Sequence, residues 1–161
     1  MTKKLSPAAI DAKDRVLLGI VQLDGRITNA DLAARVGLSP AACHKRLKRL
    51  ETSGVIRQYA ALIDPDVGGR SQSAFVHIAL DRQNSDGFEA FERAVLACPQ
   101  IIECHLMTGE YDYLLHILFR DAEEYEHLHR SVLSRLPNVT RINSGFAIRR
   151  VRRSTAIPLE V

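Results

Sequence analysis

The chain has 161 residues, of which 46% are hydrophobic and 25% are charged, a composition typical of a globular protein with a normal core. No apolar run approaches the roughly 18 residues that a membrane span needs, and the polar start lacks a signal-peptide core, so we expect a cytoplasmic protein. The net charge of +3 is uneven: residues 1–59 hold 11 Lys/Arg against 5 Asp/Glu, whereas residues 60–161 hold 11 against 14. This asymmetry indicates two modules, the basic one facing a polyanion.

Cysteine usage argues against disulfides and against a metal site. Three cysteines are an odd number without the spacing of a disulfide framework, so we expect reduced thiols at Cys43, Cys98 and Cys104. Two of them precede histidines, as Cys43-His44 and Cys104-His105. Adjacent pairs on separate elements do not match the paired clips of structural zinc, so the sequence predicts no metal and no cofactor.

The first predicted element is a helix with an apolar stripe. Ser6 and Pro7 are typical of an N-cap followed by proline at the first helical position, and Asp24-Gly25 ends the segment. We therefore predict a helix that begins at Ser6-Pro7 and turns its stripe inward. The stripe consists of Val16, Leu17, Ile20, Val21 and Leu23.

Two further helices with a sharp turn between them are expected next. Thr28 is a good N-cap for a short second helix, which Gly37 ends. Ser39-Pro40 begins a third helix that runs to about Ser53, and Gly54 supplies the left-handed residue beyond its end. The inward positions of these two helices are Leu32, Ala33, Val36, Leu47 and Leu50.

The stretch after the third helix separates the two modules. Residues 55–63 are expected to form two short strands or an extended wing, and the residues that follow are rich in turn formers, as in a linker. We predict a winged helix-turn-helix domain at residues 1–60, a linker at residues 61–71 and a second domain at residues 72–161.

The second domain begins with a strand and a helix. Every second residue from Ala74 to Leu80 is apolar, as a half-buried strand requires. A helix opens at Ser85 and ends before Pro99. Its apolar positions are Phe88, Phe91, Val95 and Leu96.

The rest of the domain completes a known topology. Strands are predicted at residues 101–108 and 111–119, joined by Gly109-Glu110 as a type II′ turn. A helix capped by Asp121 and an interrupted strand at residues 139–151 follow. The order β-α-β-β-α-β predicts an α+β protein whose second domain is ferredoxin-like, with both helices on one face of an antiparallel sheet.

The other face of this sheet is left uncovered. Phe75, His77 and Ala79 point toward it, because they alternate with the inward residues of the first strand. An open face with aromatic residues needs a partner, so we expect dimerisation.

The turn between the second and third helices predicts a helix-turn-helix that binds double-stranded DNA. Gly37 permits the sharp turn, and the following helix enters the major groove N-terminus first. We expect the early residues of this helix to lie nearest the base edges, namely Pro40, Ala41, Ala42, His44 and Lys45. Its N-cap, Ser39, is also expected to contact DNA. Phosphate contacts are expected from Arg46, Lys48, Arg49 and Arg57, and from the helix start at Thr28 and Asn29. The alternative interpretation of the basic run is a solvated helix face.

Three stretches of the chain resemble the leucine-responsive regulatory protein/asparagine regulator (Lrp/AsnC) family. They are DGRITNADLAARVGLSPAACHKRLKRLETSGVI, ECHLMTGEYDYLL and RRVRRSTAIPL. The likeness extends over essentially the whole chain and keeps the family's order and spacing. The resemblance implies a transcriptional regulator that forms homodimers through its ferredoxin-like (RAM) domains, often assembled further into octamers or other higher oligomers. One departure is Lys13, where the family often has an apolar residue.

The resemblance also implies an amino-acid effector bound between ligand domains. Carried over by position, Gly109 lets backbone amides approach the effector carboxylate, Asp112 faces its ammonium group, and residues 138–140 of a neighbouring subunit complete the pocket. The effector-binding residues implied are Met107, Thr108, Gly109, Glu110, Tyr111, Asp112, Tyr113 and Thr140. Without the resemblance, the same loop reads as an ordinary hairpin turn.

Two alternatives to an effector-responsive regulator stay open. One is an architectural nucleoid protein that wraps DNA without an effector, and the other is an enzyme similar to sirohaem decarboxylases, which resemble this family in architecture. The sequence has no nucleophile–base pair and no phosphate-binding glycine loop at recognisable spacing, so we predict that the chain is not an enzyme.

Overall fold

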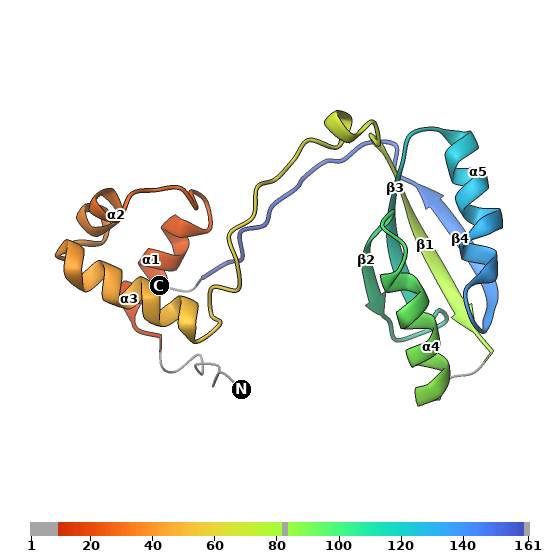
Figure 1. Cartoon of the computed structure of the whole chain (residues 1–161), viewed down its shortest axis with the longest axis horizontal. Helices are drawn as coiled ribbons and strands as arrows, with labels where there is room; N and C mark the ends of the chain where they lie inside the picture. The colour runs from red at the N-terminus through yellow and green to blue at the C-terminus, as the bar shows by residue number, and fades with distance from the viewer. Residues whose placement is uncertain (1–9, 82–83, 160–161) are drawn as a thin grey trace. The chain divides into compact units, whose positions relative to one another are not determined.

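A computed structural model describes residues 10–81 and 84–159 (Figure 1). The chain divides into two compact units, Met1–Leu62 with Arg152–Val161, and Ile63–Val151. The division falls within the predicted linker. The C-terminal segment groups with the first unit, whereas the sequence analysis assigned it to the second domain.

The first unit is built from three helices, as predicted: α1 (Ala12–Val21), α2 (Asn29–Val36) and α3 (Pro40–Thr52). Their buried side chains form one apolar core. Its fully buried members include Leu17, Leu32, Cys43 and Leu50. The three helices therefore support one another, since none buries its apolar stripe alone.

Helix α1 begins later than expected. Asp11 is its N-cap: the Asp11 side chain accepts a hydrogen bond from the Asp14 amide at 2.8 Å, and the Asp14 carboxylate accepts one from the Asp11 amide at 3.2 Å. This capping box satisfies the first amides of the helix, whereas the predicted start at Ser6-Pro7 lies outside the described residues. The inward position predicted for Leu23 is wrong, because α1 ends at Val21 and Leu23 is 78% exposed.

Helices α2 and α3 have the predicted caps. Thr28 accepts a hydrogen bond from the Asp31 amide and Ser39 from the Ala42 amide. Gly37 and Gly54 both have left-handed backbones, with φ of 69° and 71°. An L-residue with a side chain adopts such a φ only with strain, so glycine fixes the turn between α2 and α3 and the end of α3.

The stretch after α3 forms no strand, so the prediction of two short strands is wrong. Val55 and Ile56 pack against the three-helix core instead, and the Ile56 amide donates to the Leu50 carbonyl at 3.1 Å. Residues 57–64 have no regular structure. A short 3-10 helix, η2 (Pro65–Gly68), precedes the sheet of the second unit.

The second unit has the predicted ferredoxin-like topology. Its elements are β1 (Gln72–Leu80), α4 (Ser85–Leu96), β2 (Ile101–Leu106), β3 (Tyr113–Phe119), α5 (Ala122–Ser131), the 3-10 helix η3 (Leu133–Arg135) and β4 (Val139–Phe146). The strands are antiparallel in the order β2-β3-β1-β4. Side chains of α4 and α5 pack on the same inward residues of β1 and β3, so both helices cover one face (Figure 1).

Two details of the second unit differ from the sequence analysis. Leu96 is 85% exposed rather than inward, because α4 ends there. The β2–β3 connection is a six-residue loop at residues 107–112, not a two-residue turn, since β2 ends at Leu106 and β3 begins at Tyr113. The Met107 amide donates to the Asp112 carbonyl at 2.8 Å and closes this loop.

The second face of the sheet carries apolar side chains that no helix of the described residues covers. Phe75 is 41% exposed and stacks on the His116 ring with a centroid distance of 4.5 Å. Leu114 and Leu118 lie half-buried beside them on β3. We call this surface the open face.

Over the described ranges, no helix has the length and apolarity to cross a membrane.

Candidate nucleic-acid interface and effector site

The turn between α2 and α3 holds the two helices in a fixed arrangement. Besides the left-handed Gly37, the Asn29 side-chain amide donates to the Pro40 carbonyl at 2.9 Å and joins the starts of the two helices. Asn29 was predicted to meet a phosphate through its backbone, and the structure adds this second, positioning contact.

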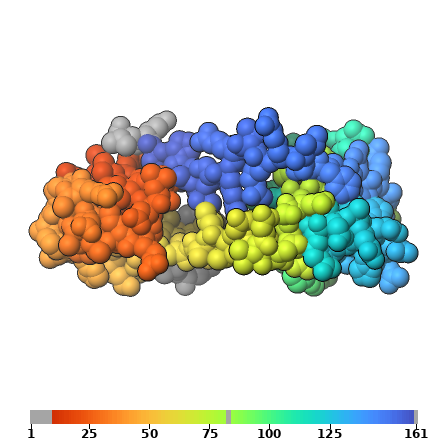
Figure 2. Space-filling model, turned by 90° about the horizontal axis from the view of Figure 1, so that it is seen from above, coloured from red at the N-terminus to blue at the C-terminus, as the bar shows by residue number. Residues whose placement is uncertain are grey.

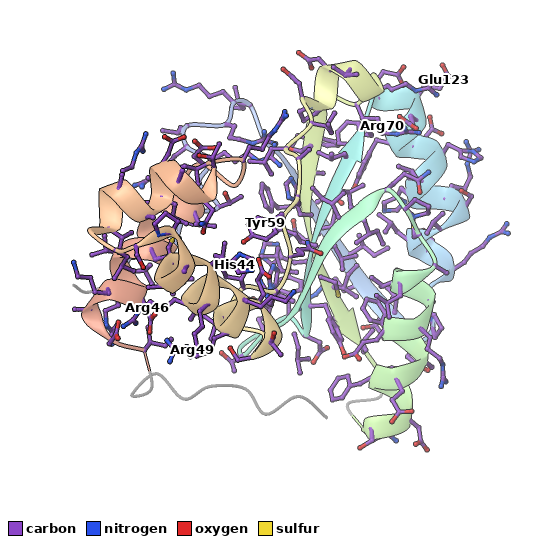
Figure 3. The ribbon with its side chains drawn as sticks, turned by 60° about the vertical axis from the view of Figure 1, so that its left-hand side comes forward. His44, Arg46, Arg49, Tyr59, Arg70 and Glu123 are labelled. Carbon is purple, nitrogen blue, oxygen red and sulfur yellow. The ribbon has the colours of Figure 1, made fainter. Side chains whose placement is uncertain are left out.

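The early part of α3 presents small and basic side chains to solvent. Most residues expected near the base edges are exposed: Pro40, Ala41, His44 and Lys45, with Ala42 half-buried. The N-cap Ser39 is exposed as well. The N-terminal half of α3 is therefore accessible, and Figure 3 shows His44 on this helix. Thr28, at the start of α2, is also exposed.

Two of the cations expected at phosphates are instead held by α1. An Arg46 Nη1 atom lies 2.6 Å from an Asp11 carboxylate oxygen and 3.0 Å from one of Asp14, and Arg49 also forms an ion pair with Asp14. Asp14 is fully buried. Figure 3 shows Arg46 and Arg49 on the side of α3 that meets α1.

These ion pairs reduce the number of cations on α3 that are available to bind a phosphate. The Arg46 guanidinium lowers the pKa of Asp11 through its hydrogen bond, and the two carboxylates raise the pKa of Arg46. The cations of α3 left without a buried partner are Lys45 and Lys48, of which Lys48 lies 3.7 Å from Glu51. Exposed pairs of this kind are weak and open easily to a phosphate.

The spacing of the charged residues contains a signal for this network. Asp11 and Asp14 are three residues apart, as are Arg46 and Arg49, so each pair lies on one face of its helix. Matching acidic and basic pairs on neighbouring helices predict an interhelical ion-pair cluster.

The loop at residues 107–112 brings part of the predicted effector set together with two residues that the analysis did not name. Arg141 forms an ion pair with Glu110 at 2.8 Å and lies over the Tyr111 ring at 4.7 Å. The Asn143 side-chain amide donates to the Tyr111 hydroxyl at 3.3 Å. Met107, Thr108 and Gly109 are exposed.

The backbone of this loop is open to a ligand. Gly109 has a φ of 115°, and a Cβ built there meets no atom within 4 Å. Within the described chain, the amides of residues 108–111 have no hydrogen-bond acceptor. Successive free amides of this kind are typical of an anion-binding nest.

Three predicted effector residues form hydrogen bonds with groups outside the loop. The Asp112 carboxylate accepts a hydrogen bond from the Leu80 amide at 2.7 Å, so it also serves the end of β1. Tyr113 is buried in the core, where its hydroxyl donates to Glu92 at 2.8 Å and burial raises its pKa. Thr140 donates to the Ala79 carbonyl at 3.0 Å.

A metal site finds no support in the part of the chain that the structure covers, where no three His, Cys, Asp or Glu side chains cluster. Cys43 and Cys98 are buried and Cys104 is exposed, all as free thiols.

A helix-turn-helix unit followed by a ferredoxin-like unit with an open face and a free loop defines a two-domain transcriptional regulator of the helix-turn-helix class.

Comparison with protein families supports both halves of this assignment. Residues 10–57 match a model described as winged helix-turn-helix DNA-binding, and residues 73–157 match the Lrp/AsnC ligand binding domain. The chain belongs to the Lrp/AsnC family, which confirms the resemblance found in the sequence.

Curated relatives align with most of the chain or with nearly all of it. The leucine-responsive regulatory protein of Escherichia coli is 39% identical over 159 residues, 99% of this chain and 97% of the relative. An uncharacterised helix-turn-helix transcriptional regulator of Sinorhizobium fredii is 47% identical over 116 residues, 72% of this chain and 91% of the relative. These relatives are regulators, so the prediction that the chain is not an enzyme is confirmed.

Solved structures show the same architecture. A transcriptional regulator of Neisseria meningitidis in complex with L-methionine superposes with a TM-score of 0.88 at 36% identity, covering 92% of this chain and 96% of that one. A feast or famine regulatory protein of Mycobacterium tuberculosis, complexed with L-methionine, gives 0.81 at 31% identity over 94% and 100%.

Proposed function

We propose that this regulator binds specific DNA sites through the exposed start of α3 and that an amino acid bound at the loop of residues 107–112 controls it. The observation that carries the first half is the α3 surface itself. It follows a tight turn at Gly37, and it presents Ser39, Ala41, His44 and Lys45 to solvent. Small side chains allow close approach to base edges, and the basic ones match the charge of a duplex.

Lys48→Ala tests the α3 assignment. Because Lys48 is exposed and has only a weak partner, its replacement is expected to leave the fold intact and to weaken binding to all DNA sequences alike. The slope of log binding constant against log salt concentration is expected to decrease in magnitude by about one unit. Titration of an upstream promoter fragment at several salt concentrations measures this slope. The matched control is Arg130→Ala, which removes an exposed cation with a Glu126 partner from the second unit. Equal slopes for Lys48→Ala and wild type contradict the assignment.

The effector half rests on the free loop amides and on the family's L-methionine complexes. A carboxylate placed over the amides of residues 108–111 satisfies donors for which the described residues supply no acceptor. Asp112 and Glu110 supply negative charge beside the loop for an ammonium group. Relatives named as leucine-responsive, or solved with L-methionine, make these two amino acids the first to test.

L-Leucine or L-methionine is expected to stabilise the protein against heat. At about 100 times its dissociation constant, a ligand that binds only the folded state adds about 2.7 kcal/mol. Melting curves with each of the twenty amino acids measure this effect.

Gly109→Val tests whether the stabilising amino acid binds at the loop of residues 107–112. A branched residue is strained at a φ of 115°, so the variant is expected to lose the stabilisation. Gly68→Ala is the control, because Gly68 lies in open space without a positive φ. If no amino acid raises the melting temperature of the wild type, the sensing assignment fails while DNA binding stands.

We further propose that two copies join through the open face. The support is its half-exposed Phe75 and neighbouring apolar residues on β1 and β3. A dimer places two recognition helices on two DNA half-sites, which a regulator of discrete sites requires. Footprinting separates this function from DNA packaging: a regulator protects spaced half-sites, whereas a packaging protein protects DNA uniformly.

A further inference from the structure

The C-terminal segment carries charge that the proposed function has not used. Residues 60–148 hold seven arginines against thirteen Asp/Glu, a net charge of −6, whereas residues 149–161 hold four arginines against one glutamate, a net charge of +3. The four are Arg149, Arg150, Arg152 and Arg153, which we call the arginine segment. The acidic character of the C-terminal half therefore ends abruptly at the end of the sheet domain.

The side chains of the arginine segment are available for binding. All four arginines are exposed, and none forms an ion pair or hydrogen bond with a described residue. Figure 2 shows this segment, in deep blue, at the surface. In contrast, Arg46, Arg70 and Arg141 each have a carboxylate partner at 3.1 Å or less. The arginine segment is thus a concentrated charge without an internal counter-charge among the residues described.

The second half of the arginine segment, Arg152 and Arg153, belongs to the DNA-binding unit. Residues from Arg152 onward group with α1, α2 and α3, whereas Arg149 and Arg150 group with the sheet unit. Just beyond the arginines, the Gln22 side chain makes two reciprocal hydrogen bonds with the Ile157 backbone: Nε2 donates to the carbonyl at 3.1 Å, and Oε1 accepts from the amide at 3.0 Å. Gln22 is the C-cap of α1, so this bond pair fixes the chain end on the helix that supports α3.

We propose that the arginine segment is a second DNA contact, which binds the phosphate backbone of the duplex that α3 reads. The inference rests on the proposed DNA-binding function. Guanidinium groups bind phosphate oxygens in a bidentate fashion, and contacts of this kind add affinity without reading sequence. An extended segment without regular structure follows a backbone readily, because its arginines are free to adjust to successive phosphates.

The test compares two full-length double variants that remove the same charge. Arg152→Gln/Arg153→Gln is expected to lower the magnitude of the salt slope by about two units, because each lost phosphate contact changes it by about 0.9. Affinity for specific and random DNA is expected to fall by the same factor, on the order of tenfold. Arg93→Gln/Arg130→Gln is the control, since both arginines are exposed on helices of the second unit. This control is expected to have the salt slope and the DNA affinity of the wild type.

Other outcomes of this experiment are equally decisive. If the wild type binds no DNA, the proposed function itself fails. If the wild type binds and the Arg152→Gln/Arg153→Gln variant has the same slope, only the second contact is overturned. An alternative partner for these arginines is the acidic surface of a second copy of the chain, and sedimentation tests this alternative. If Arg152→Gln/Arg153→Gln loses assembly while its dimers keep the wild-type salt slope, the proposal is also overturned. Arg152→Lys/Arg153→Lys keeps the charge and is expected to restore the slope.

Discussion

Replacing Asp14 with alanine is expected to destabilise the helix-turn-helix unit by about 3 kcal/mol, the scale observed when one partner of a buried ion pair is removed. Asp14 is fully buried and accepts hydrogen bonds from Arg46, Arg49 and the Asp11 amide. The variant loses all three bonds, and the bond from the Asp11 amide is half of the capping box of α1. For a unit of this size, the melting temperature is expected to fall by roughly 15 °C.

Circular dichroism of the helices during heating measures this change. Asp24→Asn is the matched control, because Asp24 is exposed and its carboxylate accepts only from the Arg26 amide nearby. This control is expected to stay within about 0.5 kcal/mol of the wild type. A melting temperature of Asp14→Ala within about 2 °C of the wild type contradicts a stabilising role for the network.

A double-mutant cycle tests whether Asp14 stabilises the unit through its ion pair with Arg49. The side chains of Arg46 and Arg49 are 31% and 43% exposed, so both rehydrate when the carboxylate is gone. Arg49→Ala in the Asp14→Ala background is therefore expected to cost much less than Arg49→Ala alone. Additive effects of the two replacements mean that they act independently.

The sequence was sufficient to predict the fold where local signals are strong. The caps at Thr28 and Ser39, the left-handed glycines at positions 37 and 54 and the alternation along β1 each depend on neighbouring residues, and all have the expected structure. The start of α1 was missed because two capping signals compete there, and only Asp11 has an acidic residue three positions later that returns the bond.

The candidate sites were harder to predict because long-range contacts decide them. Whether Arg46 faces a phosphate or a carboxylate depends on α1, which lies more than thirty residues earlier in the chain. Likewise, the Asp112 carboxylate accepts a hydrogen bond from the Leu80 amide, 32 residues earlier in the chain, a contact that no local turn rule contains. The sequence correctly predicted which residues of α3 are charged and exposed. Which group each charged side chain bonds to depends on how the helices and strands pack.

Replacing Phe75 with aspartate is expected to separate the proposed dimer. Phe75 lies on the open face, where it stacks on His116 and is 41% exposed in the single chain. A central aromatic residue of an interface contributes at least about 2 kcal/mol, and a buried unpaired carboxylate adds a further cost. The dissociation constant of the dimer is therefore expected to rise by at least roughly 30-fold.

Sedimentation over a range of protein concentrations measures this constant. Leu96→Asp is the control: it introduces the same charge at an apolar residue that is 85% exposed at the end of α4, away from the open face. It is expected to dimerise like the wild type. If Phe75→Asp keeps the wild-type dissociation constant while Leu96→Asp weakens assembly, the copies meet through the helices, and the open face needs another partner. If the prediction holds, Phe75→Asp also binds a two-half-site operator no better than a single half-site, because each recognition helix then acts alone.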